Sequence, residues 1–195
     1  FWSAEELGII GSAQYVAAPL LPLRRAVAYL NFDMVGRLRE RLMVQGLGSS
    51  PAWRPLADSV ARAQGLAVSL EDDPYLPTDV SAIFPKGVPV LALFTGAHED
   101  YHRPTDDSPK INFEGMQRIV AYAAALGRPL ARGALRPPLG TPAANPHGTM
   151  RGTGTAMRVT VGTLPDYAAE GVKGMKLSGV RAGSPARDPP RGEPA

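Results

Sequence analysis

The chain has 195 residues, of which 44% are hydrophobic, a share that is normal for a globular protein with a packed core. It has no cysteine, which excludes disulfides and thiolate ligands, so any metal site has to use His, Asp and Glu. The formal net charge is only +3 and the Arg residues are scattered, which argues against a nucleic-acid partner. No stretch reaches the ~18 apolar residues that a membrane span needs.

The N-terminal residues carry neither an initiating Met nor a signal peptide. The opening segment, Phe1 to Glu6, is typical of the end of a strand whose beginning would lie further upstream. We therefore expect the sequence to be an internal piece of a longer protein, so that the missing targeting signal says nothing about location.

The front of the chain predicts alternating helices and strands. A short helix is expected over Ser12–Ala18, with its first residue as the N-cap. The apolar run Arg25–Phe32 predicts a strand that ends at Asp33. A serine followed by Pro51 predicts the start of a second helix, which Gly65 would end.

The next segments continue this alternation. Val88–Phe94 is a short apolar run without polar alternation, which is typical of an interior parallel strand. Asn112 is expected to cap a last helix. The apolar face of that helix is expected to consist of Met116, Ile119, Val120, Ala123 and Leu126. The order of elements predicts an α/β fold, with a mostly parallel sheet flanked by helices.

The composition changes in the back of the chain, which predicts further boundaries. Residues 1–128 are expected to form the first domain, and the Pro- and Gly-rich stretch 129–155 a linker. Two strands are expected after it, at Met157–Val161 and Met175–Val180. Residues 187–195 are charged and rich in proline, and we expect them to be disordered.

Polar residues cluster near the predicted strand ends. They are Glu5 with Glu6, Asp33, Asp79, and His102 with Asp106 and Asp107. Ligands of open parallel sheets bind at the carboxyl ends of the strands, where distant side chains converge. Carboxylates with an imidazole, and without thiolates, suit Zn²⁺ or a similar borderline metal. Each cluster also has an ordinary explanation, as a helix start, a turn or a surface histidine, and the spacing alone leaves both explanations open.

Four motifs resemble those of the co-catalytic zinc aminopeptidases, a family that includes bacterial leucyl aminopeptidase, the Streptomyces aminopeptidase and the glutamate carboxypeptidases. The segment from Ser3 to Gly8, with Gly11-Ser12 behind it, resembles the motif AEE-x-G-x-x-GS. Three further segments resemble the motifs N-x-D-M-x-G, SD-x-x-x-F and YH-T-P-x-D. They are Asn31–Gly36, Thr78–Phe84 and Tyr101–Asp107.

The resemblance implies a zinc exopeptidase with a phosphorylase/hydrolase-like sandwich fold, acting on peptides with a free N-terminus. By motif, Glu5 would be the general base that takes a proton from the attacking water. Glu6 and His102 would ligate one zinc ion and Asp33 a second. The residues expected to orient these ligands or the substrate's free amine are Asp79, Tyr101 and Asp106.

The motifs also show a departure from the family. Its pattern includes an earlier H-x-D segment and an Asp that bridges both metals, and both belong upstream of Glu5. We therefore expect the fold to be incomplete at the N-terminus, and this polypeptide alone to bind zinc weakly and to hydrolyse little. By analogy with the family, the expected location is secreted or periplasmic.

The back of the chain resembles a different fold. Arg158–Tyr167 and Gly174–Pro185 look like the first half of a PDZ-like domain, which we place at residues 156–186. Such a domain would capture an extended peptide by adding it as a strand to a sheet edge. The alternative is a disordered tail with a chance similarity.

Two other functions remain open at this point. One is aminoacyl transfer of the glutaminyl-cyclase kind, with a single zinc ion on the same fold. The other is a peptide-binding scaffold that keeps the fold without catalysis. The context Met34–Gly36 and the PDZ-like segment favour the peptidase.

Overall fold

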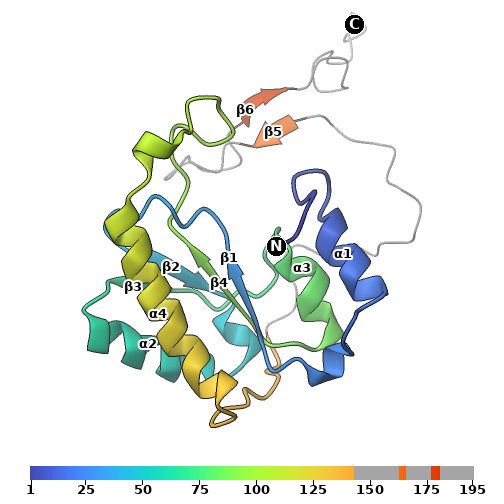
Figure 1. Ribbon diagram of the computed structural model, residues 1–195. Coiled ribbons are helices and arrows are strands. Elements are labelled where there is room, and N and C mark those ends of the chain that lie inside the picture. Colours follow the sequence, from blue (N-terminus) through green and yellow to red (C-terminus); the bar gives the residue numbers. More distant parts are fainter. Residues whose placement is uncertain (143–162, 166–176, 181–195) are drawn as a thin grey trace, which may run out of the picture. The chain divides into compact units, whose positions relative to one another are not determined.

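The computed structural model describes residues 1–142, 163–165 and 177–180 (Figure 1). The chain forms two compact units. The first consists of Phe1–Gly96 with Pro104–Thr149, and the second of Ala97–Arg103 with Met150–Ala195. Within the described part of the chain, no helix is long and apolar enough to cross a membrane.

A four-stranded mixed sheet forms the centre of the first unit. Its strand order is β1-β4-β2-β3, where β1 is Tyr29–Phe32, β2 is Leu42–Gln45, β3 is Val68–Leu70 and β4 is Val90–Phe94. β1 pairs with β4 in parallel, as does β2 with β3, whereas β2 and β4 are antiparallel. The expected α/β fold is confirmed, and one pair of strands departs from the parallel arrangement.

Helices cover both faces of this sheet (Figure 1). On one face lie α2 (Trp53–Gln64) and α4 (Phe113–Ala131), and on the other lie α1 (Ile10–Ala17) and α3 (Val80–Ile83). Short 3-10 turns lie at Leu23–Arg25, Leu47–Ser49, Phe84–Lys86 and Ser108–Lys110.

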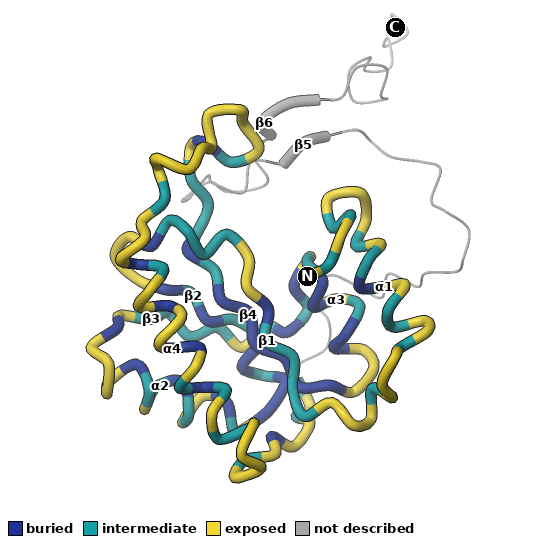
Figure 2. Tube along the Cα trace, viewed as in Figure 1, coloured by how far each residue is buried: buried dark blue, intermediate teal, exposed yellow. Residues whose placement is uncertain are grey.

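Strand β4 is buried along almost its whole length (Figure 2). Leu91 and Leu93 belong to the core cluster with α2 and α4, while Val90 and Ala92 belong to the cluster with α3. Successive side chains of a strand point to opposite faces of the sheet. The continuous apolar run of the sequence therefore follows from helices on both sides.

Helix α4 begins as its sequence predicts. The side chain of Asn112 accepts a hydrogen bond from the Gly115 amide at 2.8 Å, which confirms the expected cap. The expected apolar face is wrong at Val120, which is 61% exposed. Tyr122 is fully buried in its place, and its hydroxyl donates to the Ala57 carbonyl at 3.1 Å.

Several element boundaries differ from the expected ones. β1 starts at Tyr29 and not at residue 25, because its partner β4 starts at Val90, opposite Tyr29. α2 starts at Trp53, because the Ser50 hydroxyl accepts from the Ala52 amide within the preceding turn. α4 continues to Ala131, three residues beyond the expected domain boundary at 128.

The second unit contains a two-stranded antiparallel pair. β5 is Thr163–Pro165 and β6 is Leu177–Val180, with a register shift between Leu164 and Pro165. β6 lies within the strand expected at 175–180, whereas β5 was not expected. The strand expected at 157–161 lies outside the described residues, so the PDZ-like assignment of 156–186 stays a prediction.

Candidate active site

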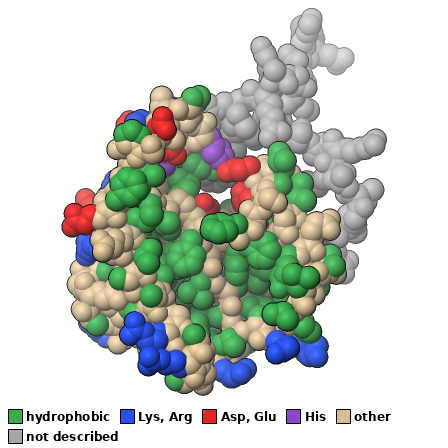
Figure 3. Space-filling model, viewed as in Figure 1, with side chains coloured by type: hydrophobic (Ala, Val, Ile, Leu, Met, Phe, Trp, Pro, Cys, Tyr) green, Lys and Arg blue, Asp and Glu red, His purple; other side chains and the backbone are tan. Residues whose placement is uncertain are grey.

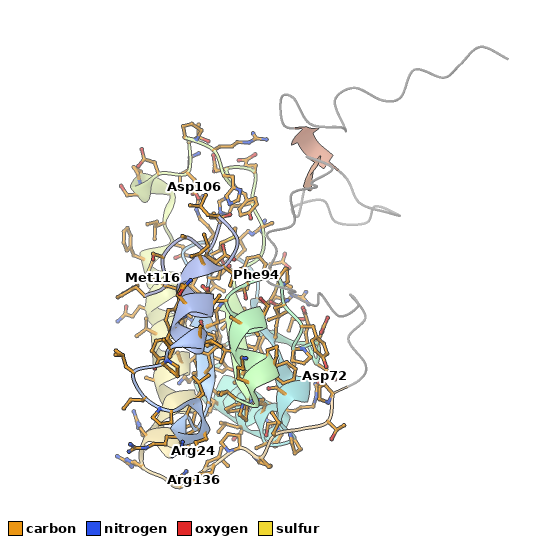
Figure 4. The ribbon with its side chains drawn as sticks, turned by 90° about the vertical axis from the view of Figure 1, so that its right-hand side faces the viewer. Arg24, Asp72, Phe94, Asp106, Met116 and Arg136 are labelled. Carbon is orange, nitrogen blue, oxygen red and sulfur yellow. The ribbon has the colours of Figure 1, made fainter. Side chains whose placement is uncertain are left out.

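Acidic residues lie at the carboxyl end of the parallel pair β1 and β4. Asp33 follows β1 directly, as its sequence predicts. Figure 4 shows Asp106 at the same end of the first unit as Phe94, the last residue of β4, while Arg24 and Arg136 lie at the opposite end. Of the candidate residues, Asp33 and Asp106 therefore lie towards this end of the sheet.

Glu5 and Glu6 lie in a tight loop, which we call the glutamate loop and define as residues 3–10. The expected strand before them is wrong, because residues 1–4 form no strand. The Glu5 carbonyl accepts from the amides of Gly8 at 2.9 Å and Ile9 at 2.7 Å, which closes the loop on itself. Glu5 is half-buried and Glu6 is exposed.

The glutamate loop packs tightly against the start of α1. The Gly11 amide donates to the Ser3 carbonyl at 3.0 Å, and a Cβ at Gly11 would lie only 2.4 Å from that oxygen. Ala4 and Ile9 both have left-handed backbone angles, with φ of 56° and 60°, which non-glycine residues rarely adopt. The glycine of the motif is therefore required by close backbone approach.

Ser12 and Asp79 form a buried contact between α1 and α3. The Ser12 hydroxyl donates to Asp79 Oδ1 at 2.5 Å, and the two residues are 0% and 8% exposed. Ser12 is not the expected N-cap, because α1 starts two residues earlier and the cap residue Ile9 makes no side-chain bond. Asp79 lies at the start of α3 and not at a strand end.

A second contact joins the chain before the glutamate loop to β1. Trp2 Nε1 donates to the Tyr29 hydroxyl at 2.9 Å, and that hydroxyl donates to Asn31 Oδ1 at 2.7 Å. Burial raises the pKa of Tyr29 to about 12; the bond from Trp2 lowers it, and the negative charges of Asp79 and Asp33 raise it. The negative charges of both candidate aspartates therefore act on the Tyr29 hydroxyl.

Tyr29 is a residue that the sequence reasoning missed. Residues 29, 31 and 33 alternate along β1, so they share one face of the strand. That spacing is the signal that could have linked Tyr29 to the motif containing Asn31 and Asp33.

The turn after Asp33 is fastened to the end of β4. The Thr95 hydroxyl donates to the Met34 carbonyl and accepts from the Arg37 amide at 3.3 Å. Arg37 also forms an ion pair with Asp106, whose side chain is 40% exposed. These bonds hold the segment that follows Asp33 against residues that come much later in the sequence.

Tyr101 and His102 belong to the second unit, in the segment 97–103. Their rings stack with centroids 3.8 Å apart at 21°, and His102 has a left-handed φ of 55°. Among the described residues, no three His, Asp or Glu side chains form a group that could hold a metal ion. Ligation of zinc by Glu6, Asp33 and His102 therefore stays a prediction.

The surface of the described residues carries no large basic area on the face drawn in Figure 3. Lys and Arg side chains there lie in separate groups, most of them along the lower rim. The expectation that the protein has no nucleic-acid partner stays a prediction.

Comparison with known proteins identifies the family. The model of the family described as "Peptidase family M28" matches residues 1–127. These include the glutamate loop, Asp33, Asp79 and His102. The chain belongs to peptidase family M28. The expected relation to zinc aminopeptidases is thereby confirmed.

Two curated relatives of this M28 chain are leucine aminopeptidases by name. Leucine aminopeptidase 2 of Trichophyton rubrum is 32% identical over 181 residues, covering 75% of this chain and 36% of the relative. The probable leucine aminopeptidase 2 of Aspergillus oryzae is 36% identical over 159 residues, covering 64% and 32%. The chain thus spans about a third of the length of these relatives.

Solved structures support the M28 fold. The zinc aminopeptidase BSAP from Bacillus subtilis matches with a TM-score of 0.55 and 26% identity, covering 67% of this chain and 34% of that one. The LapA aminopeptidase of Legionella pneumophila matches with a TM-score of 0.55 and 22% identity, covering 67% and 38%. The second likeness supports the fold alone.

Proposed function

We propose that this M28 chain provides the catalytic glutamate and part of the metal site of a zinc aminopeptidase, which removes N-terminal residues from peptides. The observation that carries the proposal is the position of the glutamate loop. The residues on either side of this loop are held by hydrogen bonds. Trp2, before it, bonds to Tyr29 of β1, and Ser12, after it, bonds to Asp79 at the start of α3. Asp33 directly follows β1.

The donor set fits zinc by its chemistry. Glu6, Asp33 and His102 offer carboxylate oxygens and an imidazole nitrogen, and the chain has no competing thiolate. We assign Glu6 and His102 to one ion and Asp33 to a second. Bound zinc would supply Lewis acidity, polarising a carbonyl and making water acidic near neutral pH.

Glu5 is proposed to transfer the proton. Its carboxylate accepts a proton from the attacking water while the new bond from oxygen to the carbonyl carbon forms. It then gives that proton to the leaving amine nitrogen as the peptide bond breaks. The hydrogen bonds from the Gly8 and Ile9 amides to the Glu5 carbonyl support this role, because they fix the backbone that carries the Glu5 side chain.

Hydrolysis is favoured over the alternatives. The named relatives are leucine aminopeptidases, whereas aminoacyl transfer has no support among them. A scaffold without catalysis would keep the contacts around the glutamate loop but would show no turnover. Asp79, Tyr101 and Asp106 are proposed to orient metal ligands or the substrate's free amine.

The test is release of p-nitroaniline from leucine p-nitroanilide, together with zinc content, in the longer protein of which this chain is expected to be a piece. We expect Glu5→Gln to lower kcat by about 100- to 10,000-fold, the usual contribution of a general base. Glu114→Gln, an exposed position in the first turn of α4, is the matched control and should keep normal turnover. Full turnover in Glu5→Gln would reject the base assignment.

Two further proposals rest on resemblance. The location is proposed to be secreted or periplasmic, which fractionation of the producing cells tests. Residues 156–186 are proposed to bind an extended peptide as a PDZ-like segment. Equal affinity for an extended peptide in the whole chain and in a chain shortened to residues 1–142 would contradict that assignment.

A further inference from the structure

Asp79 has two possible roles at this site, contact with substrate or support of the glutamate loop. We propose that Asp79 is a positioning residue, which acts through Ser12 to hold the glutamate loop and does not touch substrate. The inference rests on the proposed function for its kinetic readout. Its structural readout does not depend on catalysis.

Burial argues against contact between Asp79 and substrate. The residue is only 8% exposed, and its Oδ1 accepts the bond from a serine that is fully buried. A carboxylate that binds a substrate amine has to present surface to it. Asp33, in contrast, is exposed at the end of β1.

The path from Asp79 to the glutamate loop is short. Ser12 follows Gly11, whose amide bonds to the Ser3 carbonyl and whose Cα packs against the backbone of Ser3. The Ser12 hydroxyl also lies 3.5 Å from the Ile9 carbonyl. A displacement of Ser12 therefore moves both ends of the loop that carries Glu5.

The contact also adds a constraint that the loop's own bonds lack. Backbone bonds among residues 3–11 close the loop on itself but do not fix it to the body of the protein. The Ser12 bond reaches across 67 residues of sequence to α3. Together with the bond from Trp2 to Tyr29, it fastens the loop on both sides.

Amide hydrogen exchange of the whole chain is the first test. We expect Asp79→Ala and Ser12→Ala to speed exchange of the Gly8 and Ile9 amides by about tenfold or more, the usual effect of losing a charged hydrogen bond. Exchange at Ile119 in α4 should not change. Asp79→Asn keeps the acceptor and should restore most of the protection. Ser81→Ala, an exposed serine of α3, is the control.

Two outcomes of this test would overturn the proposal. Unchanged exchange in the glutamate loop would mean that the bond does not position it. Equal acceleration at Ile119 would mean that the bond supports the whole fold without singling out the loop.

Steady-state kinetics give the second test. A positioning role predicts that Ser12→Ala and Asp79→Ala lower kcat similarly, with KM nearly unchanged, and that the double variant loses no more than either single one. A raised KM in Asp79→Ala but not in Ser12→Ala would place Asp79 against the substrate. These kinetics are measured in the longer protein of which this chain is expected to be a piece. If that protein, unaltered, shows no turnover, the proposed function fails, and hydrogen exchange alone decides the role of Asp79.

Discussion

The indole Nε1 of Trp2 donates a hydrogen bond to the Tyr29 hydroxyl at 2.9 Å. Because Tyr29 donates in turn to Asn31, its hydroxyl serves as both acceptor and donor. A single phenol thus joins the residues before Glu5 to the strand that ends at Asp33.

Replacing Tyr29 with Phe removes both hydrogen bonds but keeps the ring. We expect the free energy of unfolding to fall by about 1–3 kcal/mol, because the partners of the hydroxyl lose their bonds in a partly buried place. Urea unfolding measures the loss. Tyr15→Phe keeps the ring that lies 5.1 Å from that of Trp2 and should change stability by less than about 0.5 kcal/mol. Equal losses in both variants would contradict the role of the hydroxyl.

Stability should fall at alkaline pH because of Tyr29. Its pKa is raised from 10.0 to about 12 by burial, so the folded state holds the phenol proton more tightly than the unfolded chain does. The stabilisation is complete below about pH 10 and is lost as the pH rises towards about 12. Burial also raises the pKa of Tyr122, so Tyr29→Phe should remove only part of the slope. Unfolding midpoints measured across this pH range give the dependence of stability on pH. The same dependence in Tyr29→Phe as in the unaltered protein would contradict the role of Tyr29.

Ser49 is a buried hydroxyl that joins α2 to β4. Its Oγ donates to the Val90 carbonyl at 2.8 Å and accepts from the Val90 amide at 2.9 Å and from Trp53 Nε1 at 3.0 Å. We expect Ser49→Ala to destabilise the fold by about 1–3 kcal/mol for each partner left unsatisfied. Thermal unfolding measures this, with the exposed Ser59→Ala on α2 as control. A near-neutral Ser49→Ala would show that water replaces the hydroxyl.

Gly11 and Gly127 offer a matched pair of glycine substitutions in helices. Gly11→Ala should disturb the glutamate loop, because the new Cβ would lie 2.4 Å from the Ser3 oxygen. Gly127→Ala has no atom within 4 Å of the new Cβ, and should stabilise α4 by up to about 1 kcal/mol. Hydrogen exchange at Gly8 and Ile9 together with thermal unfolding distinguishes the two. Unchanged hydrogen exchange of the Gly8 and Ile9 amides in Gly11→Ala would show that the glutamate loop accommodates the new methyl group without losing its hydrogen bonds.

The sequence predicts best those elements whose pattern is long or strongly apolar. The α4 cap at Asn112 and the buried strand around Leu91 are local signals, and both were predicted. Strands β2 and β3 were missed because they are short, with only four and three residues, too few to show a clear periodicity. Helix α3 is a single short turn without a cap bond, so it leaves no periodic pattern.

The site shows the same division between local and distant signals. The place of Asp33 after β1 follows from the apolar run before it. The contact between Ser12 and Asp79 could not be predicted, because it joins residues 67 positions apart through the packing of α1 on α3. The residues around Ser12 predict an N-cap, but its hydroxyl bonds instead to Asp79, a partner that is distant in the sequence.

The antiparallel direction of β2 relative to β4 has a consequence for how the rim beside Asp33 can vary. A parallel strand at that place would need a crossover of about a dozen residues or more around the sheet. Here the chain leaves β1 and enters β2 at the same end of the sheet, so residues 33–41 connect the two strands at that end. Insertions in the exposed part of that segment would leave the layers intact while reshaping the surface beside Asp33, so related chains can differ there in length without a change of fold.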